Sequence, residues 1–123
     1  MKYPSNEVYV LEGPAAYQKI SEVNFRRIVG EGGSPAVVTF SSNWMGGAAM
    51  LHLLMEDMWA EYSNKAYFFC VDLEKSKLAK EFSIVNTATI CFFYKGEMVD
   101  QQVGLVSKSK LRKKLEDFIQ RLS

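Results

Sequence analysis

The amino-acid sequence predicts an α/β fold, with a mixed central sheet of about five strands flanked by four helices. The first observation comes from residues 37–54. There an apolar β-branched run passes through a polar turn and the Gly46-Gly47 pair into a helical pattern, which is half of a βαβ unit. The second is that the segments at 36–40 and 66–73 are continuously apolar, as buried parallel strands are. The third is the turn Lys95-Gly96-Glu97 between two strand-like runs, which predicts an antiparallel hairpin.

The remaining elements follow from their spacing and their boundary residues. Ser21 is a suitable N-cap for a helix that reaches about Val29. An amphipathic helix after Ser107 closes the chain, because apolar residues return there at helical spacing. In chain order, we expect a short edge strand at 17–20, a helix at 21–29, a strand at 36–40, a helix at 47–62, a strand at 66–73, a helix at 75–82, strands at 88–94 and 98–103, and the closing helix.

The helix at 47–62 is expected to be apolar over much of its circumference. Leu51, Leu54, Met55, Met58 and Tyr62 keep the 3.6-residue spacing of one covered face. Met50 and Leu53 widen this stripe. Met55 and Met58 are expected in the core, whereas Met45 and Met50 are expected near the surface at the start of the helix, where methionine suits adaptable apolar recognition.

Composition and charge exclude several classes of protein. The chain has 123 residues, which suits one domain, expected at 17–123 after an N-terminal extension at 1–16. Its formal net charge of +1 argues against a general nucleic-acid binder. It has no apolar run of the roughly 20 residues that a membrane helix needs, and no secretory leader pattern at its start. We therefore expect a cytoplasmic protein without nucleic-acid or membrane partners.

Few side chains in the sequence suit catalysis or metal binding. Cys70 and Cys91 lie in apolar strand-like runs, so both are expected to be buried thiols, as in a reducing compartment. His52 is the only histidine and has no Cys or acidic neighbour in the local sequence, so we expect a partly exposed helix residue and no metal site. No cofactor is expected.

The closing helix is rich in basic residues. The simpler interpretation is a solvated helix face, since Glu97, Glu116 and Asp117 moderate the charge. A surface for an acidic partner is the alternative. The basic residues are Lys108, Lys110, Arg112, Lys113 and Lys114.

Five short patterns occur along the chain. They are Val23-Asn24-Phe25 in the first helix, Phe40 with Trp44, Val71-Asp72, the hairpin Phe92-Phe93-Tyr94-Lys95-Gly96-Glu97, and Val103-Gly104-Leu105-Val106-Ser107. In this order they resemble the first helix, the F-W-A-x-W-C-G-P-C motif, the V-D-V-D strand, the L-F-K-N-G-E hairpin and the V-G-A-x-S turn of the thioredoxin family, over about residues 17–122. The resemblance implies a thioredoxin-like fold with sheet order first, third, second, fourth and fifth strand.

The departures from the family pattern concern redox chemistry. Met45-Gly46-Gly47-Ala48 stands where the family has C-G-P-C, so both redox cysteines are absent. Thr39 replaces the family's buried aspartate, Ala88 replaces its cis-proline, and Leu53 replaces a helix proline. A thioether and a methyl group cannot exchange disulfides, because that reaction needs a thiolate. The chain is therefore expected not to be an intact family enzyme.

The resemblance then implies a groove without thiol chemistry. Our first hypothesis is a redox-inactive module that binds a protein or peptide partner through the former active-site groove. The alternative is a family-related oxidoreductase with residual thiol chemistry through Cys70 or Cys91. The implied groove residues are Trp44, Met45, Gly46, Gly47, Asn86, Thr87, Ala88, Gly104 and Leu105.

Two geometric expectations follow from the implied fold. Cys70 and Cys91 would lie two strands apart, roughly 10 Å, which is beyond the about 7 Å that a disulfide allows between Cα atoms. The Thr87–Ala88 peptide bond is expected to be trans, because a cis bond before a residue other than proline costs about 2.5–4 kcal/mol.

Overall fold

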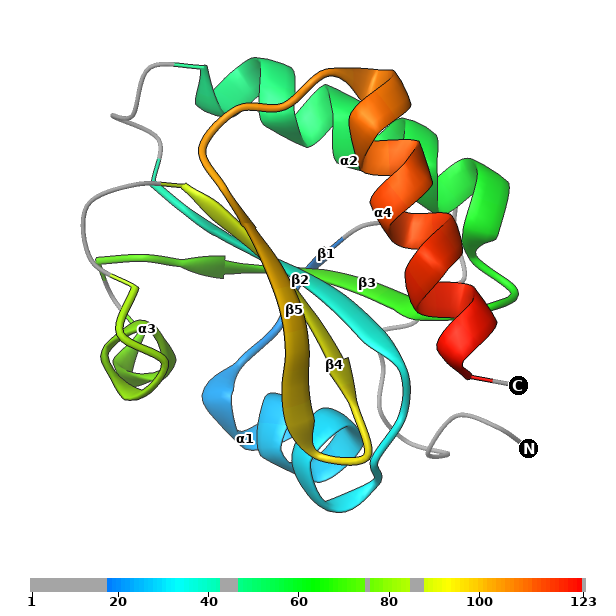
Figure 1. Cartoon of the computed structure of the whole chain (residues 1–123). Coiled ribbons are helices and arrows are strands. Elements are labelled where there is room, and N and C mark those ends of the chain that lie inside the picture. The colour runs from blue at the N-terminus through cyan, green and yellow to red at the C-terminus, as the bar shows by residue number, and fades with distance from the viewer. Residues whose placement is uncertain (1–17, 43–46, 75, 85–87, 123) are drawn as a thin grey trace.

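The computed structural model describes residues 18–42, 47–74, 76–84 and 88–122, and Figure 1 shows how its elements are arranged. The expected element order is confirmed, with boundaries that differ by a few residues. The elements are β1 (Gln18–Lys19), α1 (Glu22–Phe25), which continues as the π-helical segment η1 (Arg26–Glu31), β2 (Ala36–Ser41), α2 (Ala48–Tyr62), β3 (Tyr67–Asp72), α3 (Lys77–Glu81), β4 (Thr89–Tyr94), β5 (Glu97–Val103) and α4 (Lys108–Arg121).

Within the described residues, the sheet has five strands in the order β1-β3-β2-β4-β5, which is the order that the resemblance implied. β3 pairs in parallel with both β1 and β2, whereas β4 runs antiparallel to β2 and to β5. The hairpin between β4 and β5 turns at Lys95 and Gly96, both of which have positive φ. The sheet is therefore mixed, with parallel strands at one side and the hairpin at the other.

Serine hydroxyls cap three of the helices. Ser21 Oγ accepts a hydrogen bond from Asn24 N at 3.1 Å, which confirms the expected cap of α1. Ser76 and Ser107 cap α3 and α4 in the same way. Each hydroxyl satisfies a backbone N–H group that has no partner inside its own helix.

The first helix differs from the expectation of a plain α-helix ending near Val29. Its second half, η1, is wound as a π-helix, and Gly32 N donates to Arg27 O five residues earlier at 2.9 Å. A Cβ atom at Gly32 would lie only 2.6 Å from Ile28 O, so this wide final turn needs glycine there. Arg26, at the start of η1, forms ion pairs with Glu22 and with Glu81 of α3.

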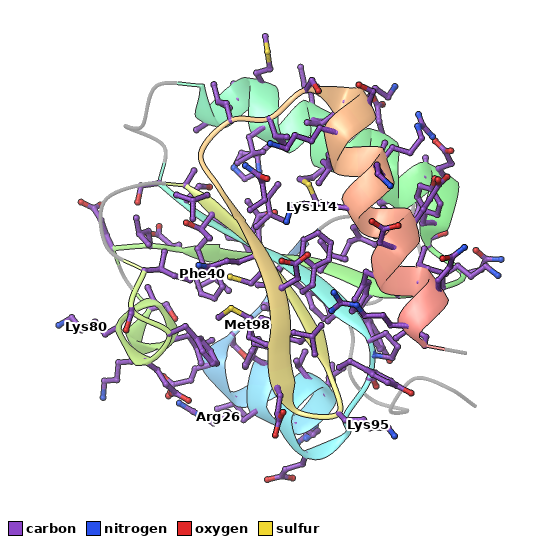
Figure 2. All side chains as sticks on the ribbon, viewed as in Figure 1. Arg26, Phe40, Lys80, Lys95, Met98 and Lys114 are labelled. Carbon is purple, nitrogen blue, oxygen red and sulfur yellow. The ribbon has the colours of Figure 1, made fainter. Side chains whose placement is uncertain are left out.

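Two hydrophobic cores lie on opposite faces of the sheet. Helices α1 and α3 cover one face, and α2 and α4 cover the other (Figure 1). In the first core the rings of Phe25, Phe82 and Phe93 meet edge to face, with centroids 5.1–6.0 Å apart. Figure 2 shows Phe40 in the interior of the molecule. In the second core the ring of Phe92 packs against Phe118 of α4 at 5.3 Å.

Helix α2 is apolar over a wider part of its circumference than the fold buries. Met55 and Met58 are fully buried and Met50 is 68% exposed, as expected, and Leu53 is 63% exposed. Two large apolar side chains of α2 are therefore left at the surface.

The basic side chains of α4 are mostly balanced by carboxylates within the chain. Lys108 reaches Asp57 at 3.4 Å, and Arg112 pairs with Glu61, so both basic residues join α4 to α2. Lys114, labelled in Figure 2, lies 3.2 Å from Asp100 of β5. Lys113 pairs with Asp117 inside α4. These pairs favour the interpretation of α4 as a solvated face over a surface kept for an acidic partner.

Candidate peptide-binding groove

Helix α2 begins at Gly47, and the side chain of Leu105 lies close to this glycine. Gly47 is the N-cap residue and has φ 83°, a left-handed conformation that favours glycine. A Cβ atom built on Gly47 would lie 2.8 Å from Leu105 Cδ1. The loop after β5 therefore approaches the start of α2 directly, and the lack of a side chain at Gly47 makes room for Leu105.

The same loop is fixed to the start of β4. Gly104 N donates a hydrogen bond to Ala88 O at 2.8 Å, which extends the β4–β5 pairing one residue beyond the Thr89–Val103 pair. Gly104 has φ 81°, so it turns the chain away from the ladder at this point. Leu105, next in the chain, is 59% exposed.

Four of the nine predicted groove residues are thus brought together in space. They are Gly47, Ala88, Gly104 and Leu105, from three separate segments of the chain. The other five, Trp44, Met45, Gly46, Asn86 and Thr87, lie outside the described residues. The predicted trans geometry of the Thr87–Ala88 bond falls there too and stays a prediction.

Exposed apolar side chains border this cluster, and the sequence analysis did not place all of them. Met50 lies one helical turn after Gly47, and Leu53 follows one turn later on the same side of α2. Val103 at the end of β5 is 54% exposed. The residues of β5 are alternately exposed and half-buried, and Val103 lies on the exposed side of the strand.

A polar cluster lies on the other side of β2 from Ala88. Ser41 Oγ and His52 Nε2 are 3.3 Å apart, so the structure supplies a partner for His52 that its local sequence lacks. His52 is half-buried, as expected. Thr39 and Ser42 are buried, and neither hydroxyl has a hydrogen-bond partner in the part of the chain that the structure describes.

Burial lowers the pKa of His52 below its ordinary value of 6.5; nearby Lys19 adds to this effect and Glu56 opposes it. The unfolded chain then binds the proton more readily than the folded one. We expect the free energy of unfolding to fall as the pH drops from 7.5 to 5.5, with the loss beginning near 6.5.

The variant His52→Gln is expected to have a shallower pH dependence than the wild type over that range. Urea unfolding at half-unit pH steps would measure both curves. Parallel curves for the two proteins would show that His52 is not the titrating group.

The two cysteines lie in different environments and are too far apart for an internal disulfide. Cys91 is fully buried in β4, and burial raises the pKa of its thiol to about 12. Cys70 in β3 is only half-buried, so the expectation of a fully buried thiol was wrong for this residue. The register pairs Thr39 of β2 with Cys70 on one side and with Ile90, the neighbour of Cys91, on the other. One strand thus separates the two cysteines, as expected.

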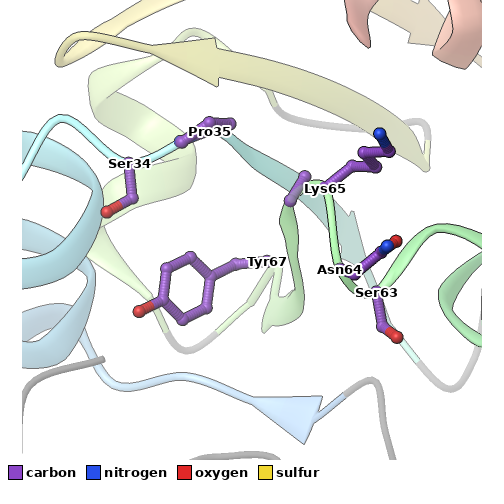
Figure 3. A pocket seen from close by; sticks show the side chains of 7 residues that line it. Ser34, Pro35, Ser63, Asn64, Lys65 and Tyr67 are labelled. Atoms are coloured by element: carbon purple, nitrogen blue, oxygen red, sulfur yellow. The ribbon is translucent and has the colours of Figure 1, made fainter. Parts of the chain in front are cut away.

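A further cavity of about 170 Å³ lies at the far end of the sheet. Its lining comes from the loops that precede β2 and β3, including Ser34, Pro35 and Asn64 (Figure 3). These loops are at the amino ends of the strands, opposite the groove. Within the described ranges, no three His, Cys, Asp or Glu side chains gather where they could hold a metal ion. Among the same residues, no helix combines the length and the apolar character that crossing a bilayer requires.

Comparison with known sequences places these features in a family. The Thioredoxin family model matches residues 16–117. The chain is 26% identical over 103 residues to the chloroplastic thioredoxin M-type of Pisum sativum, an alignment that covers 83% of this chain and 60% of that protein. It is 27% identical over 104 residues to thioredoxin 2 of Chlorobaculum tepidum, an alignment that covers 84% of this chain and 95% of that protein. The chain thus spans less than two thirds of the pea protein and nearly all of the bacterial one.

A solved structure agrees with the sequence matches. The crystal structure of the Malassezia sympodialis thioredoxin Mala s 13 superposes with a TM-score of 0.75 at 25% sequence identity, covering 93% of this chain and 98% of that one. The α/β architecture is therefore a thioredoxin fold, as expected. With the family model matching most of its length, this chain belongs to the thioredoxin family.

Proposed function

We propose that the chain is a redox-inactive protein-interaction module of the thioredoxin family, which binds an extended peptide in the groove at the amino end of α2. The observation that carries this proposal is the contact between Leu105 and Gly47. The largely exposed side chain of Leu105 lies over Gly47, which has no side chain of its own. The hydrogen-bonded backbone of Ala88 and Gly104 lies next to it. Exposed apolar residues grouped in this way are typical of a binding surface.

The residues present support binding better than catalysis. Met45 and Ala48 stand at the two positions of the redox cysteines, and neither side chain can form or reduce a disulfide. Thr39, at the position of the family's buried aspartate, has a hydroxyl that does not take up a proton near neutral pH. Ala88 at the cis-proline position keeps a backbone that a peptide strand could pair with.

The exposed apolar residues near the start of α2 support a partly apolar peptide as the partner. A peptide with one or two apolar side chains would cover Leu105, Met50 and Leu53, and its backbone would supply the hydrogen bonds of an added strand. The net charge of +1 gives no general attraction for nucleic acid. The reducing cytoplasm is the compartment that we propose, because it keeps both thiols reduced.

Leu105→Asp is expected to weaken binding of any captured peptide by about 1–2 kcal/mol or more, since it places a charge in an apolar contact. Peptides selected from an immobilised random library would serve as the probe, with affinity measured by calorimetry. Val23→Asp is the matched control, because Val23 is exposed to a similar degree, at 67%, on α1 away from the groove.

The double variant Trp44→Ala/Met45→Ser tests two further predicted groove residues and is expected to weaken binding of the same peptides. An affinity that falls equally in Leu105→Asp and Val23→Asp would place the site elsewhere. So would an unchanged affinity in both groove variants, provided that their circular dichroism matches the wild type.

The second candidate function is residual thiol chemistry. Cys70 is the better candidate for this chemistry, because Cys91 is fully buried and burial raises the pKa of its thiol to about 12. A dithiol cycle between the two would need a disulfide that the intervening strand β2 prevents. Chemistry at Cys70 would therefore involve a single thiol and an external disulfide.

A further inference from the structure

A cleft lies on the side of β2 opposite the groove, where β1 and β3 end. It consists of two adjoining cavities of about 270 Å³ and about 20 Å³. Both are lined by Lys19, Cys70, Val71 and Asp72, so they share one wall. Such a volume suits part of a small organic molecule in the larger cavity and a single polar group or water in the smaller one.

Cys70 is the cysteine that lines this cleft. It is half-buried against the second core and contributes to the lining of both cavities, whereas Cys91 is fully buried. Lys19 of β1 is its direct partner in the sheet register. The neighbouring strands therefore place an exposed lysine beside a half-buried cysteine.

The cleft carries both signs of charge. Lys19 is exposed, and Asp72 lies two residues after Cys70 along β3. Glu22 also lines the larger cavity, but its carboxylate is paired with Arg26 at 3.0 Å. Asp72 Oδ1 accepts a hydrogen bond from Glu74 N at 2.9 Å, so an ammonium group would share this carboxylate with the backbone. A ligand with both a carboxylate and an ammonium group would complement Lys19 and Asp72 better than a simple anion.

The smaller cavity of the cleft is lined by a buried hydroxyl group, that of Ser42. Ser42 is 5% exposed, lines the smaller cavity, and its Oγ has no hydrogen-bond partner in the described part of the chain. A buried hydroxyl without a partner costs free energy, so a polar atom of a ligand or a water is expected against it. Ser41 and His52, whose side chains form a hydrogen bond with each other, line the same cavity.

We propose that this cleft binds one half of a small peptide disulfide, of the class of oxidised glutathione, and that Cys70 forms a mixed disulfide with it. The ligand's carboxylate lies toward Lys19 and its ammonium group toward Asp72. The proposal deepens the second candidate function by naming its co-reactant. It does not depend on the groove, which lies on the other side of β2.

The chemical step is thiol–disulfide exchange. The Cys70 thiol loses its proton to solvent, and the Sγ thiolate attacks one sulfur of the ligand's disulfide bond. That S–S bond breaks and a new bond joins Sγ to the attacked sulfur. The other half leaves as a thiolate and takes up a proton, so Cys70 is oxidised and the leaving half is reduced.

The test uses the full chain and oxidised glutathione, followed by intact-mass measurement and peptide mapping. We expect one glutathionyl adduct per native chain, located at Cys70. It should be absent in Cys70→Ser, or in Cys70→Ala if the serine variant is unfolded, and retained in Cys91→Ser. The denatured chain should take up adducts at both of its cysteines, which shows that the reagent is competent. A native chain without an adduct, or one with the adduct at Cys91, would overturn the proposal.

Ligand recognition is tested by comparing rates with a neutral reagent, bis(2-hydroxyethyl) disulfide. Lys19→Gln should slow the reaction with oxidised glutathione about two- to fivefold, the effect of one exposed charge pair, and leave the neutral reaction unchanged. Lys65→Gln, a change to an exposed lysine at the far end of the sheet, is the matched control. Equal effects of Lys19→Gln on both reagents would contradict the proposed recognition. Failure here would leave the groove experiments unaffected, because Leu105→Asp alters a different surface.

Discussion

Phe92→Ala is expected to lower the free energy of unfolding by about 3–5 kcal/mol, which is the usual cost of removing a fully buried phenylalanine ring. Phe92 is 0% exposed in β4 and packs against Phe118 of α4, with ring centroids 5.3 Å apart. The change would leave a cavity between the sheet and α4. Since whole domains are stable by only about 5–15 kcal/mol, the variant would lose a large part of its stability.

Urea unfolding followed by circular dichroism would measure this loss. Val99→Ala, in the next strand, is the control and is expected to change stability by no more than about 0.5 kcal/mol, because Val99 is 37% exposed. Combining Phe92→Ala with Phe118→Ala should cost less than the sum of the single changes, since the two rings share one contact. A loss below about 1 kcal/mol for Phe92→Ala would show that α4 does not pack on the sheet as described.

Local sequence patterns predicted those helix starts and strands that neighbouring residues alone determine. Ser21 was predicted as a cap, because a serine hydroxyl at that position satisfies the free N–H groups of the helix that follows. The continuous apolar run at 36–40 predicted a central strand, and β2 indeed lies between β3 and β4. The strand order itself came from the family resemblance and not from any local pattern.

Other features depend on contacts between distant segments and were not visible in the sequence. The ion pair between Arg26 and Glu81 of α3, at 2.6 Å, joins residues 55 positions apart, so no local pattern predicts it. The exposure of Leu53 depends on which sides of α2 the sheet and α4 cover, and hydrophobicity alone does not reveal this.

The candidate sites also differ in whether a sequence motif could reveal their residues. Motif order was enough to select Gly47, Ala88, Gly104 and Leu105, which the fold brings together. The cleft at Cys70 was missed, because its residues come from β1, β2, β3 and α2 and form no motif along the chain. The Ser41–His52 contact likewise joins a strand end to a helix eleven residues later.

The absence of disulfide reductase activity is the prediction with the largest expected effect. Reduction of a disulfide needs an attacking thiolate and a second thiol that resolves the mixed disulfide. Met45 and Ala48 supply neither at the amino end of α2. Introducing Met45→Cys together with Ala48→Cys should create measurable activity, since cysteines at a helix amino end have a lowered pKa.

The most direct measurement is therefore insulin reduction with dithiothreitol as electron donor, compared among the wild type, the Met45→Cys/Ala48→Cys variant and a thioredoxin that has the C-G-P-C motif. The account predicts that the wild type does not exceed the rate with dithiothreitol alone, while the double cysteine variant does. Turnover by the wild type at a rate comparable to the intact thioredoxin would contradict it. Loss of that turnover in Cys70→Ser would then assign the activity to the second candidate function.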